Sequence, residues 1–441
     1  MASAAAAPED GSATRGTAFA RRQPPKPRAR RIAPPLEHRI LVTATLCLLA
    51  FGAVMVYSAS SPSGVIAGSG LGTGEFIRYL IFAGLGLIVM QVLARGGLHL
   101  LNPRVVKLML IASTVLLLLV LAPGIGVNVN GARRWFAAGP VQFQPSELLK
   151  LSLVLYVAQF LAKNPKRIGG AGRGARLVPL IAPIAVAAGP GCLLIMVEPD
   201  MGTTLVIVST IAALLIAAGM PLRQLLLVGA VAAGIVVLFV LAQPYQRARL
   251  TSFLHPWASK STAGFQAVQG QIALGSGGLF GVGLGRSVQK VFYLPEAQTD
   301  FILAVVGEEL GVMGIGVIVV LYGMIGYAGL RTARRAADRY AKLLATGLTS
   351  LILCQGTLNI FVVLGIAPLT GVPLPFVSYA PTNLCVLLAA VGLLLAIARP
   401  RVRRLQAVEA PPGDAGANRD RRRRDRRARR AGPRGRRRAE N

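Results

Sequence analysis

Apolar segments of about 20 residues recur along most of this chain, and they constrain its fold more than any other feature. In lipid, only helices and closed barrels satisfy every backbone hydrogen-bonding group, and a helix of that length spans the hydrocarbon core. Charged residues make up 15% of the chain, against about 25% in an ordinary soluble domain. The pattern predicts an all-α membrane protein, a polytopic bundle of about ten transmembrane helices near residues 40–60, 77–95, 105–125, 145–163, 178–197, 202–219, 224–243, 301–325, 342–365 and 382–398.

The basic residues indicate how this bundle is oriented. The formal net charge is +31, and the tails 1–39 and 399–441 carry 17 of it. With both termini cytoplasmic, 39 Lys and Arg residues fall on the inner side and nine on the outer side, in accord with the positive-inside rule. We expect both basic tails to be disordered and to contact anionic membrane lipid or a cytoplasmic protein. Nucleic-acid binding by the Arg421–Arg438 run is disfavoured, because no nucleic-acid fold accompanies it.

This topology gives a membrane domain at residues 40–398 with two long outer segments, 126–144 and the large extracytoplasmic loop 244–300. The four cysteines have no paired spacing and the chain has three histidines, which argues against redox, metal-cluster and zinc hydrolase chemistry. Nine acids lie within the membrane domain, and eight of them belong to the outer side or the outer parts of the spans. Ionisable groups there are costly unless paired or functional, so we look for function at the outer face.

The first outer segment and the helix after it carry a group of cations. Arg133, Arg134 and Trp135 stand in the segment itself. A proline two positions before Glu147 is typical of a first helical turn, and Glu147 and Lys150 then share one helix face. One interpretation is a self-neutralising ion pair beside an interfacial tryptophan. The other is that the cations bind an anionic headgroup such as pyrophosphate, with the glutamate holding the lysine in place.

The acidic turn at Glu198 and Asp200 interrupts two apolar runs at the outer face. Asp200 is suited to cap the following helix, and the proline between the two acids shapes a tight turn. Alternatively, the interruption lines a polar cavity, since irregular backbone at membrane depth needs shelter from lipid. A direct chemical role is not expected for this turn.

Four acids lie within fourteen residues around the start of the eighth span. Asp300 stands where it could simply cap that helix. Glu296, four residues earlier, favours another interpretation, because a second carboxylate raises the pKa of the first toward that of a general base. A divalent ion such as Mg or Mn, held by Asp300 and Glu296, is a further hypothesis.

Two other parts of the large outer loop carry weaker signals. The glycine-rich segment Gly275–Gly285 follows no βαβ unit, so we expect a flexible loop over the membrane surface rather than a nucleotide site. Arg247 and Arg249 offer two cations near the headgroup level. Headgroup contact and interfacial anchoring are equally good interpretations of these arginines.

Seven motifs follow one another in an order that resembles a known family: Gly131–Trp135, Gln144–Lys150, Pro199–Thr203, Tyr245–Trp257, Ala273–Gly285, Phe292–Glu309 and Gly371–Tyr379. By these motifs most of residues 40–398 resembles the SEDS family of bacterial cell-wall polymerases. The string Phe-Tyr-Leu-Pro-Glu-Ala-x-Thr-Asp-Phe at 292–301 is similar to the FtsW-like division members more than to the RodA-like elongation members.

That resemblance implies a ten-span fold and polymerisation of lipid II, the undecaprenyl-pyrophosphate-linked disaccharide-pentapeptide, at the outer face of the plasma membrane during septal wall synthesis. It also implies a class B penicillin-binding protein, FtsI-like, and other division proteins as partners. The family's essential aspartate matches Asp300, and its Arg-Trp and Glu-x-x-Lys positions match Arg134, Trp135, Glu147 and Lys150. In such a mechanism the aspartate takes the proton of the GlcNAc 4-hydroxyl, and cations meet the leaving pyrophosphate.

One segment departs from the family pattern. After Tyr379 the family continues with Gly-Gly-Ser-Ser or close to it, whereas this chain has Ala380-Pro381-Thr382-Asn383. Pro381 is suited to begin a helix, while the loss of two glycines could close a backbone approach that substrate or partner uses. A lipid II flippase, a non-catalytic scaffold of the division machinery and an elongation role therefore stay open. The gathering of charged residues at the outer face favours chemistry over transport.

Overall fold

The computed structural model describes residues 35–399, apart from 67–71, 130–131, 139–140, 166–176, 263 and 292. The expectations for the disordered tails 1–39 and 399–441, including the Arg421–Arg438 run, fall almost wholly outside the described residues. Gly131 and Phe292, from two of the motifs, fall outside them as well.

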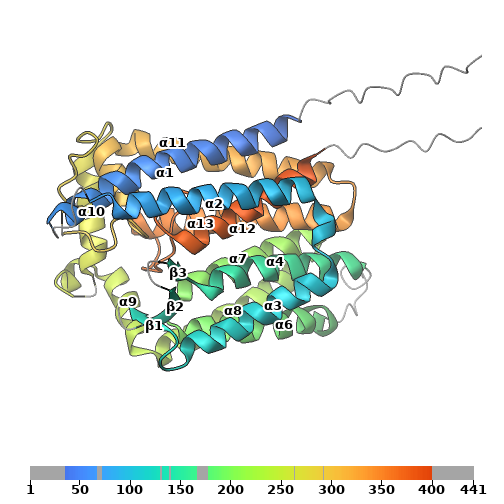
Figure 1. Cartoon of the computed structure of the whole chain (residues 1–441). Coiled ribbons are helices and arrows are strands. Elements are labelled where there is room, and N and C mark those ends of the chain that lie inside the picture. Colours follow the sequence, from blue (N-terminus) through green and yellow to red (C-terminus); the bar gives the residue numbers. More distant parts are fainter. Residues whose placement is uncertain are drawn as a thin grey trace, which may run out of the picture. The chain divides into compact units, whose positions relative to one another are not determined.

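Ten helices in the described part are long and apolar enough to cross a membrane, which confirms the prediction of an all-α polytopic bundle (Figure 1). The helix α11 continues to Arg335 instead of ending near residue 325, with a kink at Gly311, where φ is 66°. The ten helices are α1 (Leu36–Ile66), α2 (Gly74–Gly96), α3 (Pro103–Leu121), α4 (Pro145–Lys163), α6 (Leu177–Val197), α7 (Met201–Ala218), α8 (Leu222–Ala242), α11 (Ile302–Arg335), α12 (Arg339–Val363) and α13 (Pro381–Ala398).

The helices α4 and α12 form the centre of the bundle. Helix α12 packs on α4, α7 and α11, while α13 packs chiefly on α2 and α1 packs on α11. Both central helices carry polar side chains among their apolar ones, and these point inward. The outlying α8 packs on α7 and α9 and presents most of its apolar side chains outward, as a lipid-facing helix does.

The outer segments are more ordered than simple connections. The first forms a small antiparallel sheet, β1 (Val127–Val129), β2 (Ala132–Ala138) and β3 (Val141–Phe143), in that order. The second contains α9 (Pro244–Leu254), the short 3-10 helix η2 (Trp257–Ser259) and α10 (Phe265–Gly277). A second short 3-10 helix, η1 (Leu98–Leu100), follows α2. In Figure 1 the sheet, α9 and α10 gather at one end of the bundle. The sheet was not predicted, because β1 and β3 have three residues each and the seven residues of β2 do not alternate apolar with polar side chains.

The prediction of a flexible loop for Gly275–Gly285 is wrong. Its first part is the end of α10, and after it the Val282 N–H donates to the Glu308 carbonyl at 2.9 Å. A Cβ on Gly281 would collide with the backbone of Glu309, so the glycine allows a close approach of two chain segments. The glycine-rich stretch therefore holds the first turns of α11.

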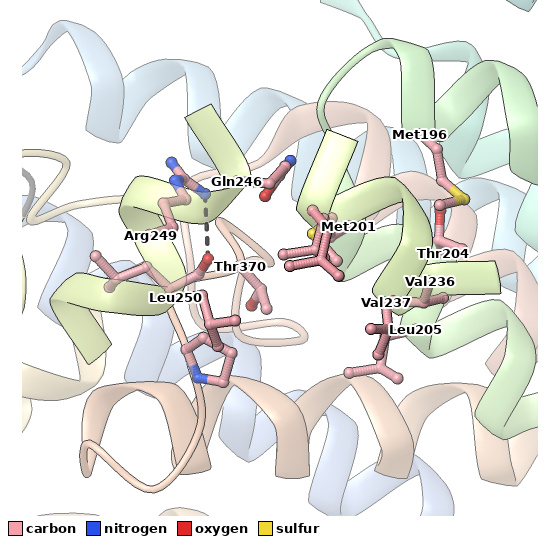
Figure 2. Close-up of a pocket in the computed structure, with 14 residues that line it drawn as sticks. Met196, Met201, Thr204, Leu205, Val236, Val237, Gln246, Arg249, Leu250 and Thr370 are labelled. Atoms are coloured by element: carbon pink, nitrogen blue, oxygen red, sulfur yellow. Dashed lines mark hydrogen bonds between the residues drawn. The ribbon is translucent and has the colours of Figure 1, made fainter. Parts of the chain in front are cut away.

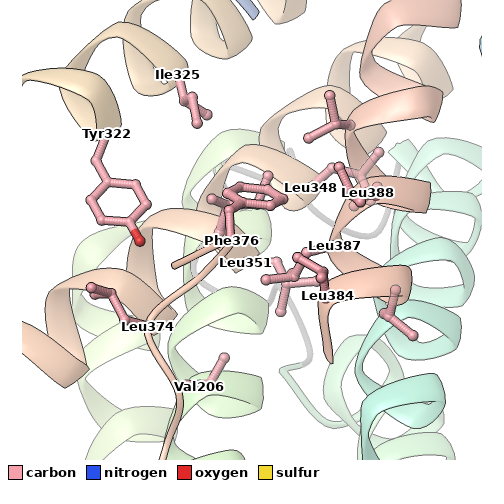
Figure 3. Close-up of a cluster of buried hydrophobic side chains, with 14 of the residues drawn as sticks. Val206, Tyr322, Ile325, Leu348, Leu351, Leu374, Phe376, Leu384, Leu387 and Leu388 are labelled. Atoms are coloured by element: carbon pink, nitrogen blue, oxygen red, sulfur yellow. The ribbon is translucent and has the colours of Figure 1, made fainter. Parts of the chain in front are cut away.

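Between α12 and α13 the chain enters the bundle as a non-helical segment with a turn at residues 375–377; we call residues 371–379 the internal loop. Phe376 of this loop lies among leucines of α12 and α13 and is 1% exposed (Figure 3). Non-helical backbone is tolerated at membrane depth where protein groups satisfy it. Here Tyr79 donates to the Phe376 carbonyl at 2.6 Å and Tyr322 donates to the Pro375 carbonyl at 2.7 Å.

Candidate active site

Asp300 lies just before α11, at the end of the bundle where the outer segments gather. The Thr299 hydroxyl lies 3.1 Å from Asp300 Oδ1 and 3.0 Å from Glu296 Oε2, so the two carboxylates share one hydroxyl. Burial, and then the charge of Glu296, raises the pKa of Asp300 to about 6. The N-cap position of α11 belongs to Phe301, so Asp300 is not that helix's cap. A half-buried carboxylate with a raised pKa is suited to accept a proton.

The other two acids of this cluster are occupied in the structure. Glu308 accepts hydrogen bonds from the Ser287 hydroxyl and, at 2.9 Å, from the Val288 N–H. Glu309 forms an ion pair with Lys290 at 2.7 Å, and both side chains are buried. These two glutamates tie the loop before Asp300 to α11.

Two elements face Asp300 across the site. Gly371 of the internal loop has a φ of 69°, and a Cβ added there would stand 3.8 Å from Asp300 Oδ2. Arg249 of α9 donates to the Leu369 carbonyl at 3.2 Å, stacks over Tyr245, and partly offsets the rise in the pKa of Asp300. Arg247, two residues earlier on α9, is exposed.

A cavity of about 260 Å³ adjoins this arrangement, between α7, α8, α9 and residues 368–370. Its walls are mainly apolar side chains, among them Met201 and Leu205 (Figure 2). Arg249 and Gln246 are the polar side chains that α9 contributes to it. The cavity thus combines an apolar interior with a cation that also faces Asp300.

The arginine predicted at the headgroup binds backbone in this structure. Arg134 of β2 donates to the Glu198 carbonyl and to the Pro199 carbonyl, both at 2.8 Å. Its guanidinium lies 5.9 Å from the ring of Trp135, and both side chains are half-buried, as is Arg133. Because residues alternate along a strand, Arg133 and Arg134 point to opposite faces of the sheet.

The acidic turn holds one capping acid and one isolated acid. Asp200 accepts from the Thr203 N–H at 3.0 Å, which confirms the predicted cap of α7. Glu198 is 1% exposed, and within the described part neither of its carboxylate oxygens has a hydrogen-bond partner. Burial, and then the charge of Asp200, raises the pKa of Glu198 to about 8, against the opposing effect of Arg134. Glu198 is therefore a neutral acid at pH 7.

Glu147 and Lys150 form a buried ion pair inside the bundle, 2.9 Å apart. Lys150 also donates to the Gln355 Oε1 at 2.9 Å, and Asn383 donates to Glu147 at 2.7 Å. Both charged side chains are 1% exposed. The structure therefore keeps this pair apart from Asp300 and from the outer surface.

The segment that departs from the family pattern makes its own contacts. Pro381 opens α13, as its position predicted. The Thr382 hydroxyl accepts from the Gln144 N–H at 3.1 Å, and Asn383 reaches Glu147. These side chains bind the start of α13 to the start of α4.

Sequence reasoning missed the side chains that support the site from α12. Asn359 donates to the carbonyls of Asp300 and Val372, and Gln355 donates to the carbonyl of Pro373. Two amides four residues apart inside an apolar span were a usable signal, because polar groups at membrane depth need partners.

As for metals, the described residues contain no group of three or more His, Cys, Asp or Glu side chains, so Asp300 and Glu296 stand as a pair.

The sequence is similar to a known protein family over most of its length. The family model of cell cycle proteins that covers FtsW, RodA and SpoVE matches residues 39–402. Stage V sporulation protein E of Bacillus subtilis is 40% identical over 362 residues, covering 82% of this chain and 96% of that protein. The probable peptidoglycan glycosyltransferase FtsW of Coxiella burnetii is 41% identical over 364 residues, covering 81% of this chain and 95% of that protein.

Solved structures show the same architecture. A chain from a structure titled "Structural coordination of polymerization and crosslinking by a peptidoglycan synthase complex" superposes with a TM-score of 0.65 at 28% identity, covering 82% of this chain and 98% of that one. The rod shape determining protein RodA of Thermus thermophilus superposes with a TM-score of 0.59 at 27% identity, covering 85% of this chain and 99% of that one.

Proposed function

Because this multi-pass membrane chain belongs to the FtsW, RodA and SpoVE family of cell cycle proteins, the SEDS family, we propose that it is a peptidoglycan glycosyltransferase. Its substrate is lipid II, which it polymerises into glycan strands at the outer face of the plasma membrane during septal wall synthesis. One observation carries the proposal. Asp300, with its raised pKa, faces Gly371, which directly follows Thr370 of the cavity wall, and Arg249 of the same wall acts on the charge of that carboxylate.

In the proposed reaction Asp300 is the general base. It takes the proton of the GlcNAc 4-hydroxyl of one lipid II, and that oxygen forms a bond to the MurNAc anomeric carbon of the growing chain. The bond from that carbon to undecaprenyl pyrophosphate breaks, and the pyrophosphate leaves with the electron pair. A pKa of about 6 leaves Asp300 mostly ionised at pH 7 and makes it a stronger base than an ordinary aspartate.

The substrate's two ends require different surroundings. The cavity between α7 and α8 accepts part of the polyprenyl chain, and Arg249, with Arg247 near it, meets the pyrophosphate. Arg133, Arg134 and Trp135 lie at the same end of the bundle and form a second contact for the headgroup. A Mg or Mn ion bound by Asp300 and Glu296 would neutralise the leaving group, and polymerisation with and without EDTA tests that ion.

Glu147 and Lys150 belong to this proposal as residues that act from inside the bundle, since both are buried. The proposed partner is a class B penicillin-binding protein, FtsI-like, at the division septum, and both termini are cytoplasmic. The similar chain from a peptidoglycan synthase complex supports such a partner. The distribution of basic residues supports the orientation.

Glycan polymerisation from labelled lipid II, by the purified protein with its class B transpeptidase, tests the proposal. We expect product from wild type and none from Asp300→Ala. Asp338→Ala is the matched control, because that carboxylate lies at the N-cap of α12, away from the outer segments, and should leave the rate unchanged. Full activity of Asp300→Ala would assign the base to another group, such as Glu296.

The same assay separates the alternatives. Product from Ala380→Gly/Pro381→Gly but not from wild type would identify a non-catalytic scaffold. Movement of labelled lipid II across vesicles without any polymer would identify a flippase.

A further inference from the structure

Helix α12 carries two buried amide side chains, Gln355 and Asn359, that take no part in the proposed chemistry. Gln355 is 0% and Asn359 is 1% exposed. Residues four apart lie on the same helix face, one turn from each other, so both amides point at the same neighbouring segment. That segment is the internal loop 371–379.

Asn359 joins Asp300 to the internal loop through its amide nitrogen. Its Nδ2 donates to the Asp300 carbonyl at 2.7 Å and to the Val372 carbonyl at 2.8 Å. Both partners are acceptors, so only the NH₂ group with its two protons can serve them together. Its Oδ1 has no hydrogen-bond partner within the described residues. The amide therefore uses its two N–H donors in these contacts, and its oxygen takes no part in them.

The joined segments form two walls of the site. Gly371, directly before Val372, faces Asp300 Oδ2, and a Cβ there would stand 3.8 Å away. Holding the Val372 carbonyl against the Asp300 carbonyl therefore fixes the distance between the carboxylate and the loop that it faces. One turn earlier, Gln355 donates to the Pro373 carbonyl at 2.9 Å and accepts from Lys150 at 2.9 Å.

We propose that Asn359 is the positioning residue for Asp300, and that Gln355 extends the same support to the buried Glu147–Lys150 pair. The series of hydrogen bonds runs from α4 through α12 and the internal loop to the backbone of the base. This inference rests on the proposed function of Asp300. It assigns Lys150 an effect on catalysis that passes through Gln355 and the internal loop.

The test is steady-state polymerisation of lipid II by the purified protein with its transpeptidase, with three residues compared at position 359. Asn359→Leu keeps the approximate shape and removes both donors. A misplacement of about 1 Å costs on the order of 10² in rate, so we expect kcat to fall about 100-fold with KM for lipid II unchanged within threefold. Asn359→Asp, protonated in this buried site, keeps one donor and should give an intermediate kcat.

Thr349→Val is the matched control for the loss of a buried hydrogen bond on the same helix. The Thr349 hydroxyl donates to Ala345 of its own helix at 2.7 Å and does not reach the internal loop. Its kcat should stay within twofold of wild type. The graded order of Asn, Asp and Leu is a readout that loss of packing alone would not produce, and Asn359→Asp also serves if Asn359→Leu does not fold.

The results distinguish this inference from the function on which it rests. Loss of product in Asp300→Ala together with full kcat in Asn359→Leu would overturn the positioning role and leave the proposed function standing. An increase in KM at unchanged kcat would also overturn it. Full activity of Asp300→Ala would remove the proposed function itself.

Discussion

Two carboxylates of this protein differ in whether a cation is paired with them. Glu147 is buried in an ion pair with Lys150, and Asn383 donates to the glutamate while Gln355 accepts from the lysine. Asp300 is half-buried, has no ion pair in the described structure, and shares the Thr299 hydroxyl with Glu296.

This difference distinguishes a structural carboxylate from a candidate catalytic one. A buried carboxylate that is paired with a lysine holds helices together and is neutralised by that cation. A carboxylate without an ion pair, whose pKa is raised, is suited to accept a substrate proton. Glu198 is a third case, because its buried carboxylate has no hydrogen-bond partner among the described residues, and the opposing effect of Arg134 leaves its pKa raised.

The largest effect is expected when one member of the buried Glu147–Lys150 ion pair is removed. Lys150→Met leaves the Glu147 charge buried without its cation, which costs about 3–5 kcal/mol of stability. The double variant Glu147→Gln/Lys150→Met removes both charges and should recover most of that loss. Thermal unfolding of the purified protein in detergent, followed by circular dichroism, measures both. If the single and double variants were equally destabilised, the loss in Lys150→Met would not come from an unpaired Glu147 charge.

The next effect concerns the unpartnered acid. The folded pKa of Glu198, about 8, is higher than its ordinary 4.5, so the native state holds a proton that the unfolded state has lost between those values. The contribution of Glu198 to the free energy of unfolding should therefore fall as pH rises from about 5 to 8, by up to about 1.4 kcal/mol per pH unit. Glu198→Gln should remove this slope and leave stability at pH 5 nearly unchanged. Melting temperatures of both proteins between pH 5 and 8.5 check it, and identical slopes would contradict a neutral Glu198.

The sequence was sufficient to predict that Glu147 and Lys150 pair, but not which side chains form hydrogen bonds with them. The i, i+3 spacing after a helix-start proline indicated that Glu147 and Lys150 would meet, and they do. Gln355 and Asn383 come from helices about 200 residues away in sequence, and only the packing of α12 and α13 on α4 brings them there.

At the outer face, too, the sequence predicted the acidic residues but not the segments that surround them. Asp300 and Glu296 were recognisable as neighbouring acids, whereas the internal loop that Asp300 faces has no periodic signal, and its path depends on side chains of three other helices. Arg134 was expected at an anionic headgroup, yet in this structure it donates to two carbonyls of the acidic turn. An arginine's donors serve either kind of acceptor, and sequence does not distinguish them.

A smaller effect follows from the segment that departs from the family pattern. Asn383→Ser shortens the side chain that donates to Glu147 and should cost about 1–2 kcal/mol, since hydrogen bonds to charged groups are the stronger ones. Asn383→Asp should cost more, because it places a second acid against Glu147. Melting temperatures rank the two variants. If Asn383→Ser leaves the melting temperature unchanged, the hydrogen bond from Asn383 to Glu147 does not contribute to stability.

The smallest expected effect is at the exposed neighbour of the base. The proposed mechanism requires ionised Asp300, so kcat/KM of wild type should fall as pH drops through about 6. Glu296→Gln removes the like charge but leaves burial, the larger cause, in place. The acidic limb should therefore move to lower pH by a fraction of a unit, because Glu296 is exposed and its charge is screened by solvent. Initial rates of lipid II polymerisation from pH 5 to 8 measure the shift, with Asp338→Ala as the control that leaves the limb in place. A limb that moves to higher pH would mean that Glu296 supports the ionised form of Asp300, as it would if the two carboxylates held a divalent cation between them.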